Sequence, residues 1–202
     1  MQSKTNTRSR LVRNAVLGLS VLALRLGPLP AGIISYLDSG LAKMNDSGSV
    51  AFAAQVDDKQ GTTGGLFLNV ADGRTIPVAL RGLDFPVAGH SFVRLIRSDF
   101  AVNNQNDILF AAEMRNDEND SRSGAVLLYL HSERQLITVL APVDLKPETD
   151  PRSLVRVGLD GSGHAAFAIT VGGEDRLYSY EVSTKSLTIL AKDGDVAPGG
   201  GT

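Results

Sequence analysis

The feature that most constrains the fold is an internal repeat with a period of about 57 residues. An eight-residue motif occurs three times, at Asn45–Phe52, Asn103–Phe110 and Asp160–Phe167. Two further apolar runs follow each copy in the same order, near residues 66–68 and 76–80 in the first unit. Three ordered features that recur at one period predict a tandem-repeat architecture.

Each motif copy has the composition of a tight turn that leads into a strand. Its first residue is Asn or Asp, whose side-chain oxygen accepts hydrogen bonds from backbone N–H groups further along the turn. Three residues later stand Gly48 and Gly163, which adopt a left-handed backbone conformation at little cost. The middle copy has Asn106 there, and Asn tolerates that conformation better than most residues. We therefore expect a hairpin in every unit, with the phenylalanine on the apolar face of its second strand.

The pattern predicts four short strands per unit and no amphipathic helix after residue 30. The expected strands are 40–44, 50–56, 64–70 and 75–81, then 97–102, 107–114, 125–130 and 135–141, then 153–159, 164–170, 176–182 and 186–191. Four strands in about 57 residues is typical of a β-propeller blade. A β-sandwich also uses short strands but does not explain the period, and another kind of β-repeat array is the second interpretation. The predicted fold is all-β, a partial β-propeller-like array with units at approximately 31–88, 89–147 and 148–202.

The segment 1–30 differs from the rest and has two interpretations. Residues 1–37 contain five basic residues and no acidic one, and the apolar run Ala15–Leu24 follows the basic start, as in a secretory signal peptide. The run is too short to span a bilayer as a helix. Alternatively, Ala23-Leu-Arg25 aligns with Ala79-Leu-Arg81 one repeat later, which indicates the last strand of a preceding repeat.

Composition excludes several classes of function. The chain has no Cys, so it has no disulfide framework, thiolate metal site or cysteine nucleophile. The net charge of −2 is too balanced for a general nucleic-acid binder. No Trp and 5% aromatic residues leave little surface for stacking on sugars or bases.

The three histidines do not form a recognisable site. His90, His131 and His164 lie far apart in the sequence, without the short spacings of zinc sites. No G-x-S-x-G nucleophile elbow occurs, and Gly161-Ser-Gly163 belongs to the repeat's turn. We expect ordinary polar surface positions for all three.

The acidic run 116–120 raises the question of calcium. Asp117, Asn119 and Ser121 alternate as the oxygen ligands of a calcium loop do, but Arg122 stands where such a loop requires a tight-turn Gly. A solvated loop joining two strands is the favoured interpretation.

Two further patterns are better explained by the fold than by chemistry. The glycosylation sequons Asn45–Ser47 and Asn119–Ser121 arise readily from turn composition. Phe52, Phe110 and Phe167 could form a stacking platform, but their equivalent positions favour a core between neighbouring units. The sequence predicts no catalytic, cofactor-binding or metal site and no cofactor.

The pattern N-x-x-G-x-x-x-F, complete in Asn45–Phe52, resembles the bacterial tandem-repeat proteins named for it. The run Gly194–Gly200 is also similar to the linker between their units. The resemblance extends over roughly residues 31–202 and implies a propeller-like, secreted or surface-anchored protein. It brings no catalytic residue with it, because the motif is a structural turn.

These observations favour a non-catalytic secreted or cell-surface β-repeat protein that acts as a binding or scaffolding module. Its partner would be a protein or a polysaccharide, and an incomplete array could also self-associate through exposed repeat ends. The alternative is a carbohydrate-active or other hydrolase or lyase with a site built from propeller loops. We expect no nucleic-acid partner and no transmembrane helix.

Overall fold

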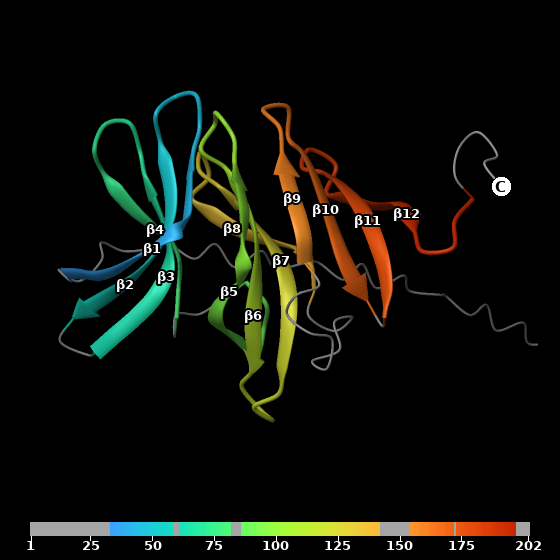
Figure 1. The fold of residues 1–202 in the computed structure, drawn as a ribbon, viewed down its shortest axis with the longest axis horizontal. Helices are drawn as coiled ribbons and strands as arrows, with labels where there is room; N and C mark the ends of the chain where they lie inside the picture. The colour runs from blue at the N-terminus through green and yellow to red at the C-terminus, as the bar shows by residue number, and fades with distance from the viewer. Residues whose placement is uncertain (1–32, 59–60, 82–85, 142–153, 172, 197–202) are drawn as a thin grey trace, which may run out of the picture.

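The computed structural model describes residues 33–58, 61–81, 86–141, 154–171 and 173–196. This part of the chain contains twelve strands in three four-stranded antiparallel sheets (Figure 1). Sheet 1 comprises β1 (Ile33–Met44), β2 (Val50–Asp58), β3 (Gly61–Asn69) and β4 (Thr75–Leu80). Sheet 2 comprises β5 (His90–Val102), β6 (Ile108–Asn116), β7 (Arg122–Leu130) and β8 (Gln135–Leu140). Sheet 3 comprises β9 (Leu154–Leu159), β10 (His164–Val171), β11 (Glu174–Glu181) and β12 (Ser186–Lys192). The all-β prediction of tandem four-stranded repeats is confirmed.

Each sheet is a simple meander, in which every strand pairs with its neighbour in sequence. The hairpin turns of the three motif copies all lie at the same upper edge in Figure 1. No helix in the described ranges is long and apolar enough to cross a membrane.

The first strands of sheets 1 and 2 are longer than the sequence pattern indicates. β1 and β5 each contain an irregularity in their pairing, between Leu37 and Ala42 and between Leu95 and Phe100. Extra residues bulge out there and pairing resumes beyond them, which breaks the two-residue periodicity. The pattern therefore revealed only the segment after the bulge. Both bulges occupy the same place in the repeat, since Leu95 and Phe100 are the equivalents of Leu37 and Ala42.

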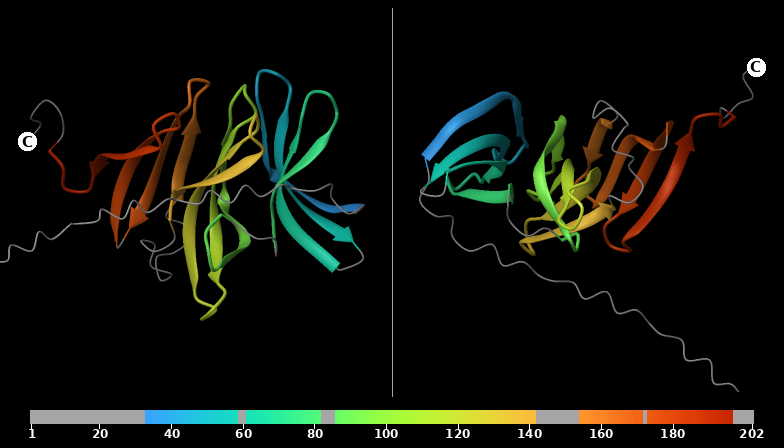
Figure 2. Two further views of the ribbon diagram at one scale, coloured as in Figure 1. Left: turned by 180° about the vertical axis from the view of Figure 1, so that it is seen from behind. Right: turned by 90° about the horizontal axis from the view of Figure 1, so that it is seen from below.

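The sheets pack face to face, and two hydrophobic cores lie between them (Figure 2). Phe110 belongs to the core between sheets 1 and 2, and Phe167 to the core between sheets 2 and 3. Both are almost completely buried. Burial of a side chain of this size stabilises the fold by roughly 1.5–3 kcal/mol. These two phenylalanines are core residues that hold neighbouring sheets together.

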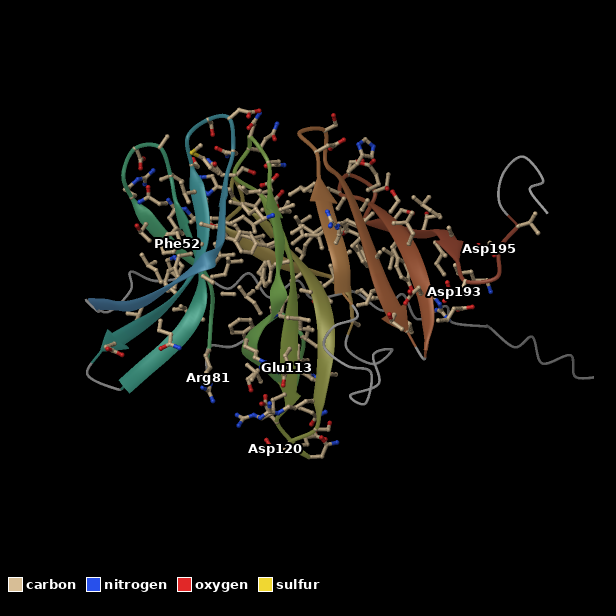
Figure 3. All side chains as sticks on the ribbon, viewed as in Figure 1. Phe52, Arg81, Glu113, Asp120, Asp193 and Asp195 are labelled. Atoms are coloured by element: carbon tan, nitrogen blue, oxygen red, sulfur yellow. The ribbon has the colours of Figure 1, made fainter. Side chains whose placement is uncertain are left out.

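Phe52, labelled in Figure 3, is only partly buried, so the expectation that all three phenylalanines are alike is wrong for this copy. Its ring stacks on Phe67 at 5.6 Å between centroids. With Ala54 and Leu80 these residues form a separate small cluster. The physical reason is position: Phe110 and Phe167 face a preceding sheet, whereas among the described residues no sheet precedes sheet 1. Residues 1–30, with both interpretations of that segment, lie outside the described residues.

Candidate functional site: the inter-sheet amide ladder

The motif turns have the predicted backbone geometry. The φ angles are 81° at Gly48, 69° at Asn106 and 89° at Gly163, all in the left-handed region. Asn106 therefore takes the place of glycine without a change in the turn. The prediction from the sequence is confirmed at all three positions.

The first side chain of each motif copy closes its own turn. Oδ1 of Asn45 accepts the N–H of Ser49 at 2.9 Å, and Oδ1 of Asn103 accepts the N–H of Asp107 at 2.9 Å. In the third copy, Oδ1 of Asp160 accepts from the residue at the same position, His164, at 2.8 Å. This function needs only an acceptor oxygen, so Asn and Asp perform it equally well.

The amide group of the two asparagines has a second function, which joins neighbouring sheets. Nδ2 of Asn45 donates to the backbone carbonyl of Asn103 at 2.7 Å. Nδ2 of Asn103 donates to the carbonyl of Asp160 at 2.9 Å. Both asparagines are buried, at 7% and 6% exposure. We call the row formed by Asn45, Asn103 and Asp160 the amide ladder; each bond connects equivalent residues of consecutive units.

Exposed side chains reinforce the ladder at the same edge. The N–H of Asp46 donates to Oδ1 of Asn104 at 3.0 Å, and Nδ2 of Asn104 donates back to Asp46 at 3.1 Å. Between sheets 2 and 3, Nε2 of Gln105 donates to the carbonyl of Gly161 at 2.9 Å. The polar residues of the motif turns are thus used to connect one turn with the next.

The third copy ends this row of amides, because the side chain of Asp160 has no N–H group to donate. Hydrogen bonds from the backbone and side chain of His164, and from the backbone of Ser162, hold the pKa of Asp160 below its usual value, so the side chain is an ionised acceptor. Its Oδ2 lies 3.1 Å from Nδ1 of His164, and Nε2 of His164 lies 2.6 Å from Oε2 of Glu181. Asp160 and His164 are exposed and Glu181 is partly exposed, so this cluster differs from the buried amides of the other copies.

The other two histidines have separate surroundings. Nδ1 of His90 lies 3.0 Å from the carbonyl of Ala88. Burial lowers the pKa of His131, whose ring packs edge-on to Tyr129. Within the described ranges, no group of three or more His, Asp or Glu side chains is placed to hold a metal ion.

The acidic run 116–120 begins at the last residue of β6 and continues into the loop 117–121 that joins β6 and β7, as the favoured interpretation predicted. Oδ1 of Asn116 accepts the N–H groups of Glu118 and Asn119, and Asn119 Oδ1 accepts that of Ser121. Oδ1 of Asp117 accepts the hydroxyl of Ser91 at 2.5 Å. The oxygens of Asn116 and Asn119 therefore stabilise the loop's own conformation, and that of Asp117 connects the loop to β5.

Sequence reasoning missed one buried acid, Glu113 on β6. Its side chain is 11% exposed and contacts two arginines, Arg94 at 2.5 Å and Arg122 at 2.8 Å. Figure 3 shows Glu113 low on the central sheet, towards the loop that carries Asp120. A carboxylate paired with two guanidinium groups tolerates burial in a strand that is otherwise apolar. Arg94, Glu113 and Arg122 lie on three adjacent strands, β5, β6 and β7. Their proximity follows from the pairing of these strands, which the sequence alone does not give.

Three face-to-face meanders joined by a side-chain amide ladder define an all-β tandem-repeat protein. The sequence profile of a family of unknown function, DUF7453, matches residues 2–202, and the chain belongs to this family. Searches of the curated proteins and of the solved structures find no match.

Proposed function

We propose that this chain is a non-catalytic, extracytoplasmic β-repeat protein that acts as a binding or scaffolding module, with its sheets arranged as the blades of a partial propeller. One observation carries the proposal: the repeated polar residues connect one sheet to the next. Asn45 and Asn103 each use the oxygen for their own turn and the amide for the following sheet.

A repeated motif with this function supports assembly of a rigid array, not recognition of a reacting group. Repeat arrays present extended surfaces built from neighbouring units, and partners bind across several units at once. A protein or polysaccharide partner therefore suits this architecture better than a small substrate. The resemblance to N-x-x-G-x-x-x-F repeat proteins supports an extracytoplasmic location.

The proposal is tested against the enzymatic alternative with a panel of polysaccharide and ester substrates. The purified chain should bind a polysaccharide in affinity electrophoresis without cleaving it. Two variants, Asp117→Asn and Glu118→Gln, remove the charge of exposed carboxylates in the β6–β7 loop without altering its length. If the chain turns over a substrate and one of these substitutions abolishes that turnover, the chain is an enzyme and the proposal is refuted.

The location is tested separately with an alkaline phosphatase fusion at the C-terminus of the full chain, since the reporter is active only after export. Activity in whole cells is the expected result. An inactive reporter in cells that contain the intact fusion would refute the extracytoplasmic part of the proposal.

A further inference from the structure

The large apolar side chains that remain exposed lie at the two ends of the row of sheets. Among the described residues they are Leu37, Met44, Leu177, Ile189, Leu190 and Val196. The first two belong to β1 of sheet 1, and the others belong to sheet 3 or follow its last strand. Sheet 2, which has a described sheet on each side, contributes none of them (Figure 1). Apolar exposure of this kind therefore marks the two end sheets.

Each sheet has two faces, and the motif phenylalanine marks one of them. Phe110 of sheet 2 packs in the core shared with sheet 1, and Phe167 of sheet 3 packs in the core shared with sheet 2. We call the face that carries this phenylalanine the leading face and the opposite one the trailing face. Both internal junctions therefore join the trailing face of one sheet to the leading face of the next.

The leading face of sheet 1 presents Leu37 and Met44. Both pair with residues of β2 that lie on the same face as Phe52. Their equivalents in the strand pairing of sheet 2 are Leu95 and Val102, which pack in the core between sheets 1 and 2. Leu37 and Met44 are instead 56% and 72% exposed, beside the small cluster that fills the centre of this face.

The trailing face of sheet 3 presents Leu177 and Leu190. Leu177 precedes Tyr178, whose side chain belongs to the core with sheet 2, so Leu177 lies on the opposite face of the strand. Leu190 is the extra residue at an irregularity in the pairing of β11 with β12. Leu177 and Leu190 are 39% and 58% exposed.

The same two positions are buried at both internal junctions. By their place in the strand pairing, the equivalents are Leu66 and Val78 in sheet 1 and Val126 and Val139 in sheet 2. Leu66 and Val78 belong to the core between sheets 1 and 2, and the other pair belongs to the core between sheets 2 and 3. Elsewhere in the molecule, these positions are thus covered by the leading face of a following sheet.

Other positions of the trailing face of sheet 3 are polar, which limits how strongly this face can bind. Ser179 and Thr188 stand where sheet 2 has Leu128 and Ile137. The apolar area available for burial is therefore smaller than at an internal junction. Association through this face should be weaker than the contact between two sheets of one chain.

The two ends also carry the two halves of one ladder bond. The carbonyls of Asn103 and Asp160 each accept the side-chain amide of the preceding unit. The carbonyl of Asn45 is their equivalent, and among the described residues it accepts the N–H of Gly48 and no side-chain amide. At the other end, the side chain of Asp160 stands where an asparagine would donate, but it has no N–H group.

We propose that the trailing face of sheet 3 binds the leading face of sheet 1 in a second copy of this chain. The junction buries four of the exposed side chains, Leu177 and Leu190 from one copy and Leu37 and Met44 from the other. The occupant follows from the molecule itself, because both internal junctions join these same two faces. The proposal rests on the proposed scaffolding function and names its partner, but association is measured without any polysaccharide, so its failure would leave ligand binding standing.

Two charge substitutions in the full chain test which faces meet. Leu190→Glu blocks the trailing face of sheet 3, and Met44→Glu blocks the leading face of sheet 1. Both side chains are exposed, so the fold should be kept, which circular dichroism checks. In sedimentation velocity the unchanged chain should associate as its concentration rises, and each variant should associate about tenfold more weakly or less. The matched control is Val196→Glu, at an exposed apolar position outside the strands, which should associate as the unchanged chain does.

A mixture of the two variants identifies head-to-tail pairing. The Met44→Glu chain keeps an intact trailing face and the Leu190→Glu chain keeps an intact leading face, so an equal mixture should form a dimer and nothing larger. Pairing of like faces would instead leave one variant associating by itself, and this result would overturn the proposal. A mixture that stays monomeric, or an unchanged chain that is monomeric at its highest soluble concentration, would overturn it as well.

A third variant tests the register of the two copies. Asp160→Asn supplies the missing amide and keeps the acceptor that closes the turn, so it should tighten association about fivefold, the effect of roughly one hydrogen bond. Asp117→Asn, which removes the same charge from the exposed β6–β7 loop of sheet 2, should leave association unchanged. No gain from Asp160→Asn, or an equal gain from Asp117→Asn, would overturn stacking in the manner of the internal junctions.

Discussion

Replacement of Asn103 by Asp tests the amide ladder with almost no change in shape. The variant keeps the Oδ1 acceptor that closes its own turn, but it loses the N–H donor to the carbonyl of Asp160. It also places a second carboxylate beside Asp107, whose Oδ2 lies 3.3 Å from Nδ2 of Asn103. The change therefore weakens the junction between sheets 2 and 3 in two ways, through the lost hydrogen bond and through the added charge beside Asp107.

The magnitude follows from these contacts. Loss of the hydrogen bond costs about 1 kcal/mol, and an unsatisfied buried group adds about 1–3 kcal/mol. We expect the free energy of unfolding to fall by about 2–4 kcal/mol, which lowers Tm by roughly 5–15 °C in a protein of this size. Thermal and urea unfolding followed by circular dichroism measure both quantities.

The matched control is Asn119→Asp, which makes the same change of charge in an exposed loop and keeps the bond to the N–H of Ser121. This control should change the free energy of unfolding by no more than about 0.5 kcal/mol.

The effect of Asn103→Asp should also depend on pH. Burial beside Asp107 raises the pKa of the new carboxyl at position 103 above its unfolded value. The penalty from its charge is therefore absent below the unfolded pKa, near 4, grows as the pH rises above that value, and is complete above the folded pKa. Equal stability of the two variants at pH 7 would refute the ladder's contribution.

Three further predictions follow from particular residues. Gly48→Val should lower the free energy of unfolding by about 1–2 kcal/mol, because a side chain at φ 81° is strained even though no atom lies within 4 Å of the added Cβ. Gly64→Val, which has equally open space and an ordinary φ, is the control in urea unfolding. Gly65→Ala should destabilise by about 1–3 kcal/mol, because the new Cβ would lie 2.4 Å from the carbonyl oxygen of Ala79; a melting temperature equal to that of Gly64→Ala would contradict this. Phe110→Ala should lower the free energy of unfolding in chemical denaturation by about 3–5 kcal/mol, and Phe52→Ala distinctly less, because only Phe110 lies between two described sheets. Equal losses would contradict this difference in packing.

Local conformation could be predicted from the sequence because its causes are local. Gly48, Asn106 and Gly163 show where the backbone must be left-handed, and the Asn or Asp three residues earlier shows where a turn begins. The periodicity of the strands depends on these same short-range signals.

Contacts between sheets could not be predicted in the same way. The ladder depends on stacking distance and on which carbonyl lies next to each amide, which no local pattern encodes. The sequence nevertheless contains one signal of these contacts. Asn45 and Asn103 in the first two copies and Asp160 in the third can all accept a hydrogen bond in the turn, but only the asparagine side chains can donate one to the next sheet. Similarly, Phe52 and Phe110 are identical in the motif, and only the arrangement of neighbours distinguishes their burial.

The amide ladder also bears on how the protein unfolds. In a repeat array, stability is the sum of what each unit contributes and what each junction contributes, and weak junctions allow one unit to open alone. Asn45 and Asn103 each serve a turn and a junction with a single side chain, so opening of the turn that displaces this side chain breaks both contacts at once. The three sheets should therefore melt in one cooperative transition, and slow hydrogen exchange at the N–H groups of Ser49 and Asp107 would report on the neighbouring sheet as much as on their own.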